Sequence, residues 1–309
     1  MKKLITAEEA ANLINDCATV AINGFALGFG FPEEICQSIE KRFLTQQHPR
    51  DLTLVFGSGC GDSGKSNFGL EHFAHETMVK RVIGGHIGLS AKLSNMICEN
   101  KIEAYNFPQG VVTHLFREIA GGRPGVLTHV GMETFVDPRV ESAKMNDTTT
   151  EDLVSVVNIN NSEKLFYKSF PIDAALIRGT TADENGNITI EKEGVALETL
   201  HIAEAAKNSG GIVIAQVERI AKEGTLNPLH VAIPGIMVDH VVVADADNHK
   251  MNSGNIYDPS FTGEIKVPVD LIPPMPLNVR KVIAKRCAAE LKLDTVINLG
   301  IGVPEGVAA

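Results

Sequence analysis

The chain has 309 residues, of which 44% are hydrophobic and 21% are charged, and its net charge is −10 with a pI of about 5.5. This composition is typical of a globular chain that is long enough to bury a large core. The acidic balance argues against nucleic acid as a partner, because a nucleic-acid surface is usually a basic face. No apolar run approaches the ~18 residues of a membrane span, so no membrane partner is expected.

The N-terminus and the cysteines predict a cytoplasmic protein. Met-Lys-Lys leads into Thr6-Ala7-Glu8-Glu9, a capping-box pattern that predicts a helix rather than a signal peptide. The five cysteines are odd in number and show no C-x-x-C spacing. They favour reduced thiols in a cytosolic protein over disulfides or a metal site.

Short apolar runs separated by helical stretches predict an α/β fold. The runs are rich in β-branched residues and occupy residues 52–56, 174–177, 211–217 and 240–244. This alternation predicts an open, mostly parallel sheet with helices on both faces. The turn-forming sequence at residues 183–187 predicts a hairpin between two further apolar runs.

Prolines mark the end of the first predicted domain. Five of them occur between residues 255 and 276, and such a segment is stiff and extended. We therefore predict a first domain over residues 1–255, a linker over 256–277 and the truncated start of a second domain over 278–309. Helical spacing in that last segment is shown by Val279, Val282, Ile283 and Leu291.

A repeat predicts that the second domain resembles the first. Residues 28–33 read Gly-Phe-Gly-Phe-Pro-Glu and residues 300–305 read Gly-Ile-Gly-Val-Pro-Glu. Each copy follows an apolar, strand-like run and precedes a predicted helix. So long a period indicates two similar domains, since solenoid units are far shorter. The second copy cannot bury its apolar residues alone, so we expect residues 278–309 to pack on a partner or to aggregate.

Glycines that follow strands are candidate ligand loops. Gly28 and Gly30 precede a predicted helix N-terminus, whose unpaired amides suit a phosphate, a carboxylate or an oxyanion. A tight turn without a ligand is the alternative. Residues 59–66 fit the P-loop pattern G-x-x-x-x-G-K-S, which would predict an NTPase. However, Asn67 and Gly69 are poor helix formers where the P-loop requires a helix, and a plain ligand loop at a strand end is the other interpretation.

Several co-linear matches together resemble the family I coenzyme A-transferases, in particular the single-chain type that fuses an α half and a β half. The matching segments are residues 23–25, 30–32, 58–70, 84–86, 106–110, 137–139, 182–187, 234–239 and 296–304. The last of them resembles the opening of the β half. The resemblance implies transfer of CoA between an acyl-CoA and short acids such as acetate or propionate. It also implies a homo-oligomer or a complementary β half as partner.

The resemblance further implies a mechanism. A glutamate carboxylate attacks the thioester, and the CoA thiolate then attacks the resulting anhydride to give an enzyme–CoA thioester. A second acid reverses both steps, so ping-pong kinetics are expected and no metal, ATP or other cofactor is needed. The nucleophile is expected beyond Ala309, which predicts that this chain is inactive alone. Glu184 is assigned to the hairpin, and Glu33 and Glu305 are assigned to helix starts.

Family positions near the acyl group predict the substrate-binding residues. Gln109 would donate its amide to a carboxylate or carbonyl, with a loop-fixing role as the alternative. The other predicted substrate-binding residues are Ser58, Gly59, Cys60, Phe25, Gly28 and Gly30. The chain differs from many relatives in carrying Gly59-Cys60 where they carry an Asn pair. No catalytic or metal-binding residue is assigned within the chain, and His86 is expected to be structural. Alternative functions are a non-catalytic module that binds acyl-CoA or carboxylates, and the P-loop NTPase.

Overall fold

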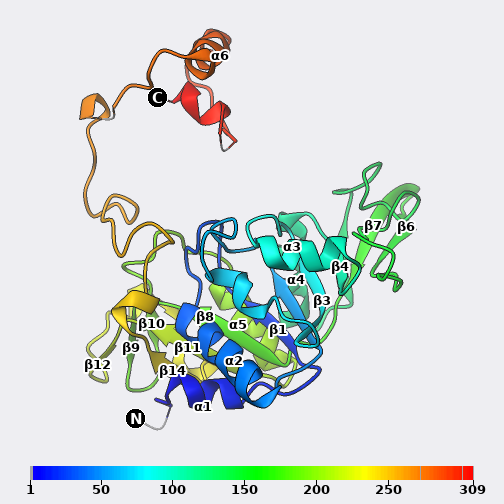
Figure 1. Cartoon of the computed structure of the whole chain (residues 1–309), viewed down its shortest axis with the longest axis vertical. Coiled ribbons are helices and arrows are strands. Elements are labelled where there is room, and N and C mark those ends of the chain that lie inside the picture. The colour runs from blue at the N-terminus through cyan, green and yellow to red at the C-terminus, as the bar shows by residue number, and fades with distance from the viewer. Residues whose placement is uncertain (1–2, 272, 301, 309) are drawn as a thin grey trace. The chain divides into compact units, whose positions relative to one another are not determined.

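The computed structural model describes residues 3–271, 273–300 and 302–308. The chain divides into two compact units, Met1–Thr262 and Gly263–Ala309 (Figure 1). The division lies within the segment for which a proline-rich linker was predicted. Within the described ranges, no helix has the length and apolar character needed to cross a membrane.

A seven-stranded sheet forms the centre of the first unit (Figure 1). Its order is β14-β11-β8-β1-β2-β3-β4, and every neighbouring pair is parallel. The strands are β1 (Thr19–Ile22), β2 (Leu52–Phe56), β3 (Val79–Gly84), β4 (Glu103–Asn106), β8 (Ala174–Arg178), β11 (Ile212–Val217) and β14 (His240–Val243). The predicted mostly parallel sheet is therefore confirmed.

Helices cover both faces of this sheet, as predicted. Successive strand residues point to opposite sides, so both faces of the sheet are apolar and each requires a covering layer. In β1, Val20 and Ile22 belong to one core cluster and Ala21 belongs to the other. The helices on the first side are α1 (Ala7–Asn12), α2 (Glu33–Gln46) and α3 (Ala91–Cys98), and those on the second are α4 (Gln109–Ala120) and α5 (Thr199–Asn208). The predicted capping box begins α1, since the side chains of Thr6 and Glu9 bond reciprocally to each other's backbone amides.

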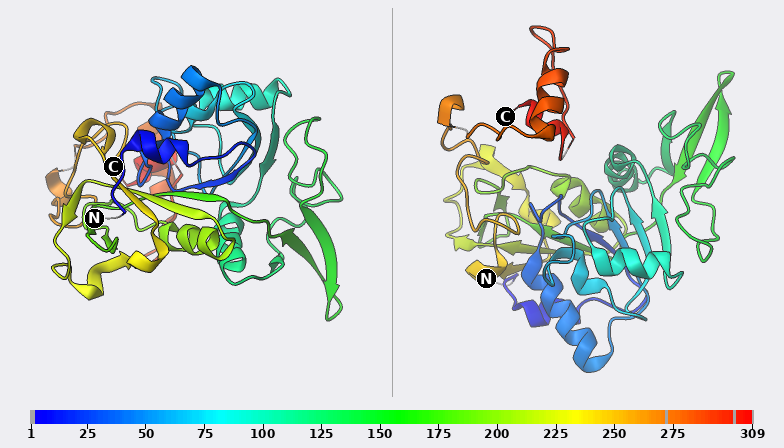
Figure 2. Two further views of the ribbon diagram at one scale, coloured as in Figure 1. Left: turned by 90° about the horizontal axis from the view of Figure 1, so that it is seen from below. Right: turned by 45° about the horizontal axis from the view of Figure 1, so that its top comes forward.

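Two smaller sheets complete the first unit. The four-stranded sheet has the order β12 (Arg219–Ala221), β9 (Thr181–Asp183), β10 (Ile188–Thr189) and β13 (Val231–Ile233). The three-stranded antiparallel sheet has the order β5 (Gly125–Thr128), β7 (Ser162–Lys168) and β6 (Val154–Ile159). Its β6–β7 hairpin extends away from the large sheet (Figure 2). The antiparallel pairing of β9 with β10 confirms the hairpin predicted at residues 183–187.

Short 3₁₀ helices connect several of these elements. They are η1 (Gly69–Phe73), η2 (Pro228–His230), η3 (Gly235–Met237), η4 (Ala246–Asn248), η5 (Val269–Leu271) and η6 (Pro304–Val307). The first of them follows the loop after β2 and helps to position it.

The second unit contains the predicted helix but not the predicted strand. Helix α6 (Val279–Ala288) begins at Asn278, whose side chain accepts a hydrogen bond from the Lys281 amide at 3.0 Å. Residues 295–300 form no strand, so that prediction was wrong. A strand needs a hydrogen-bonded neighbour, and the described part of this unit offers none. Apolar side chains such as Leu293 and Val296 are fully exposed, and a covering partner stays a prediction.

Candidate functional site

The predicted ligand loops gather at one edge of the large sheet. Neighbouring parallel strands end at the same edge, where open α/β sheets bind ligands. Residues 23–32 follow β1, residues 57–61 follow β2, residues 85–88 follow β3 and residues 107–109 follow β4. We call these four segments the glycine-loop cluster.

Close backbone contacts join three segments of the glycine-loop cluster. The Gly59 amide donates a hydrogen bond to the His86 carbonyl at 2.6 Å, and a β-carbon at Gly59 would lie 2.3 Å from that oxygen. A β-carbon at Gly85 would lie 2.2 Å from the Gly57 carbonyl and 2.7 Å from the Gln109 α-carbon. Both positions therefore require glycine, because only a residue without a side chain permits this approach.

The Cys60 thiol joins the remaining segment to this group. It is buried, and a β-carbon at Gly24 would lie 2.4 Å from its sulfur. Burial raises the pKa of the Cys60 thiol well above its usual range, and the negative charges of Glu33 and Glu198 add to this effect. The thiol is therefore neutral and packs the two loops together rather than acting as a nucleophile.

All seven predicted substrate-binding residues lie in the glycine-loop cluster, but they differ in exposure. Gln109 is exposed and Phe25 is half-buried. The buried ones are Ser58, Gly59, Cys60, Gly28 and Gly30. The side-chain amide of Gln109, at the start of α4, bonds to no other residue in the described ranges, so it is available to a ligand carbonyl or carboxylate. The binding roles themselves stay predictions.

A buried ionic network fastens the loop after β2 to helix α2. His72 of η1 contacts Glu33 (Nε2 to Oε1, 2.7 Å) and Glu40 (Nδ1 to Oε2, 2.6 Å), and His75 contacts the other Glu40 oxygen at 2.7 Å. Burial opposes the charge on His72, but hydrogen bonds and charge attraction from the two glutamates outweigh it and raise its pKa to about 9. Burial likewise opposes ionisation of Glu40, but hydrogen bonds from His72 and His75 lower its pKa to about 2. His72 is therefore a cation between carboxylates at neutral pH.

Glu33 is the first residue of α2, as expected, and it has a further role. Besides pairing with His72, it accepts a hydrogen bond from the Gly69 amide at 3.0 Å. The N-terminus of α2 is capped by Gln216 of β11, whose Oε1 accepts from two amides of the first turn at 2.9 and 3.4 Å. Glu33 thus fixes the loop after β2 to the first turn of α2.

Arg178 fixes the end of the segment that follows β1, residues 23–32. This guanidinium is buried at the end of β8 and pairs with Glu193 at 3.2 Å. Its Nη1 donates to the Phe31 carbonyl at 3.4 Å and to the Lys250 carbonyl at 2.6 Å. Neither Arg178 nor Glu198, which lies against Gly57, was predicted. No local pattern marks them, because their partners are far away in the sequence.

The loop at residues 59–66 does not have P-loop geometry. Residues 65–68 are not helical, and the next element is η1, which begins at Gly69. The Asp62 carboxylate accepts hydrogen bonds from the Lys65 amide at 2.9 Å and the Ser66 amide at 3.2 Å. A P-loop would direct its amides to phosphate, and here an acidic side chain occupies two of them.

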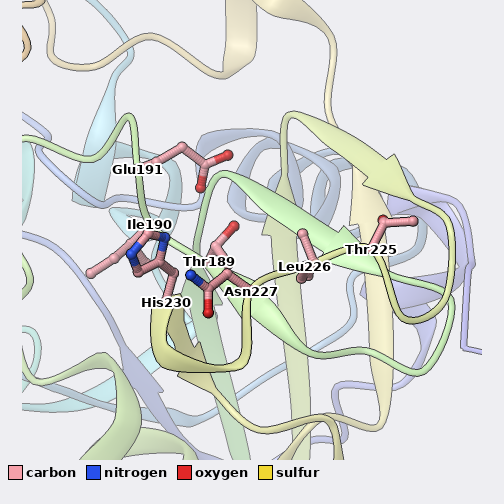
Figure 3. Close-up of a pocket in the computed structure, with 7 residues that line it drawn as sticks. All are labelled: Thr189, Ile190, Glu191, Thr225, Leu226, Asn227 and His230. Atoms are coloured by element: carbon pink, nitrogen blue, oxygen red, sulfur yellow. The ribbon is translucent and has the colours of Figure 1, made fainter.

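A cavity also lies elsewhere in the first unit (Figure 3). It has a volume of about 570 Å³ and is lined by the end of β10, the two residues after it, and the segment between β12 and β13. Its lining residues are Thr189, Ile190, Glu191, Thr225, Leu226, Asn227 and His230. Glu191 and Asn227 already bond to other residues of the chain, and no predicted site residue lies here. Nowhere in the described ranges do three or more His, Cys, Asp or Glu side chains form a group suited to a metal ion.

Comparison with known proteins gives concordant matches. The family model for coenzyme A transferase matches residues 4–244. Caffeate CoA-transferase of Acetobacterium woodii is 47% identical over 310 residues, which cover 100% of this chain and 59% of that protein. The alpha subunit of acetate CoA-transferase from Escherichia coli (strain K12) is 26% identical over 242 residues, which cover 78% of this chain and 97% of that subunit.

A solved structure agrees with these matches along the chain. The acyl-CoA transferase YdiF of E. coli O157:H7, in a thioester complex with CoA, has a TM-score of 0.92 and 37% sequence identity. The match covers 99% of this chain and 58% of that one. The chain therefore spans somewhat more than half the length of the A. woodii and E. coli O157:H7 proteins.

Proposed function

Because the chain belongs to the coenzyme A transferase family, we propose that it acts in moving CoA between an acyl-CoA and a short-chain carboxylic acid such as acetate. The observation that carries the proposal is the exposed position of Gln109, whose α- and β-carbons lie against Gly85 at the carboxyl edge of the parallel sheet. An amide there can donate a hydrogen bond to the oxygen on which negative charge develops during acyl transfer.

The proposed reaction proceeds through a glutamyl-CoA thioester. A glutamate carboxylate attacks the thioester carbonyl, which breaks the C–S bond and gives an acyl-glutamyl anhydride and CoA thiolate. The thiolate attacks the glutamyl carbonyl, forms the enzyme thioester and releases the first acid as its carboxylate. A second carboxylate reverses both steps, so the thioester bond energy is retained and neither ATP nor a metal is required. The glycine loops would keep water from the anhydride.

We assign the attacking glutamate to the part of the single-chain relatives that this chain does not span. Three glutamates in glycine-rich sequence are poor candidates. Glu33 is tied to His72, Glu184 lies in the β9–β10 turn with the Glu223 amide bonded to it at 3.1 Å, and Glu305 lies in η6 of the second unit. The chain would then supply substrate-binding walls, and its partner would be a complementary β half or a second copy that carries one.

An exchange assay tests this function. We expect no CoA transfer from acetyl-CoA to propionate by the chain alone, and transfer once it is combined with the part of the A. woodii relative that lies outside the alignment. In that mixture Gln109→Ala should lower kcat by about 10²–10³ if its amide stabilises the oxyanion. Turnover by the chain alone would refute the assignment of the nucleophile. Caffeate replacing propionate as the better acceptor would refute the short-chain assignment. Binding of acetyl-CoA without turnover in any mixture would favour a non-catalytic binding module.

A further inference from the structure

Glu198 places a carboxyl group inside the glycine-loop cluster. It is the residue before α5, and its neighbour Leu197 packs on Gly30, where a β-carbon would lie 2.8 Å from the leucine side chain. The Glu198 carboxyl lies against Gly57, because a β-carbon there would be 2.0 Å from Oε1. Glu198 can occupy this position only because residue 57 has no side chain.

The same glycine links Glu198 to the proposed substrate residue. The Gly57 carbonyl lies against Gly85, which in turn lies against the α-carbon of Gln109. Glu198 and Gln109 therefore border the same pair of neighbouring glycines, Gly57 after β2 and Gly85 after β3. A ligand carboxylate held by Gln109 would approach the negative charge of Glu198.

Among the residues that the structure describes, no side chain neutralises Glu198 directly. Its side chain does not cap α5, and no cationic side chain in the described ranges forms an ion pair with it. Burial raises its pKa, while its own backbone amide and the nearby His201 of α5 act in the opposite direction. The other titratable group that faces it is the Cys60 thiol, whose pKa is also raised. Glu198 is thus an acid that costs free energy to ionise and accepts a proton readily.

We propose that Glu198 is a positioning residue for the carboxylic acid substrate, and that its carboxyl shares one proton with the substrate carboxylate. This inference rests on the proposed function, since it requires the acid to bind at the glycine-loop cluster. Two adjacent carboxylates cannot both remain ionised at low cost, so binding takes up one proton from solvent. The proton on one oxygen of Glu198 then forms an O–H···O hydrogen bond to the substrate, and no covalent bond is made or broken.

Titration of the ¹⁵N-labelled chain with propionate, followed by NMR of the amides at residues 58–60, tests the proposal. Because a proton is taken up, Kd should rise with pH between pH 6 and 8, by up to about tenfold per unit. Glu198→Gln should keep a hydrogen-bond donor, so it should bind propionate with a Kd that no longer depends on pH. Glu198→Ala should bind more weakly at every pH. Glu184→Gln makes the same chemical change on the surface and should behave as the wild type.

Each result decides between the two proposals. A pH-independent Kd in the wild type, or a pH dependence that survives in Glu198→Gln, would overturn the role of Glu198 and leave the transferase function intact. The absence of propionate-dependent shifts at residues 58–60 would also overturn it. The CoA-exchange assay then decides separately whether the transferase function survives.

Discussion

Replacing His72 with glutamine should remove a pH-dependent part of the stability of the first unit. The wild-type His72 pKa is about 9 against an ordinary value of 6.5, a difference worth about 3 kcal/mol. A histidine with a raised pKa stabilises the fold fully below its unfolded pKa, and this stabilisation disappears as pH rises through the folded pKa. The wild type should therefore lose about 3 kcal/mol of unfolding free energy between pH 6.5 and pH 9.

Urea denaturation at pH 6.5, 7.5 and 9 measures this effect. His72→Gln leaves Glu33 and Glu40 buried without their cation, so at pH 6.5 it should be less stable than the wild type by about 3–5 kcal/mol. The gap should narrow as pH rises, because the wild type loses the same interaction. His48→Gln is the matched control, since His48 forms an exposed pair with Asp16 and should change stability by less than about 1 kcal/mol. An equal pH slope in the wild type and His72→Gln would refute the reasoning.

Two further predictions concern the loop after β2. Gly59→Ala should cost about 1–3 kcal/mol of unfolding free energy by overpacking, because its β-carbon would lie 2.3 Å from the His86 carbonyl oxygen. Gly88→Ala is the control: its β-carbon would lie 3.6 Å from the His86 ring, so it should be nearly neutral in the same denaturation assay. Equal costs for the two variants would contradict this account. Because Asp62 occupies two loop amides, calorimetry with Mg²⁺-ATP should show no binding by the wild type, and ATP binding that Lys65→Ala abolishes would restore the NTPase alternative.

The elements that could be predicted from the sequence are those set by local patterns. Short β-branched runs predicted the parallel strands, the capping box predicted α1, and the turn residues predicted the β9–β10 hairpin. The strand predicted near Thr295 was wrong because a pattern of apolar residues does not supply the neighbouring strand that pairing requires.

The candidate site was likewise predicted only in part. Family-like motifs pointed to Gln109 and to the loop at residues 58–60, which the fold places close together. The pairing of His72 with Glu33 could not be predicted, because the two lie 39 positions apart and meet only once η1 packs on α2. Glu198 likewise contacts Gly57 only once the sheet has formed, so no local sequence pattern predicts this contact.

The contacts of Arg178 set a minimum length for any fragment of the first unit that folds on its own. The family match ends at residue 244, yet the buried guanidinium bonds to the carbonyl of Lys250, and the Ser253 amide bonds to the Leu27 carbonyl at 2.7 Å. A fragment cut at the end of the match would keep the Glu193 and Phe31 partners of Arg178 but would remove its Lys250 acceptor at 2.6 Å, at a cost of about 1–3 kcal/mol. It would also release the loop that carries Gly28 and Gly30. The boundary of stable folding therefore lies beyond Ser253, outside the boundary of recognisable family sequence.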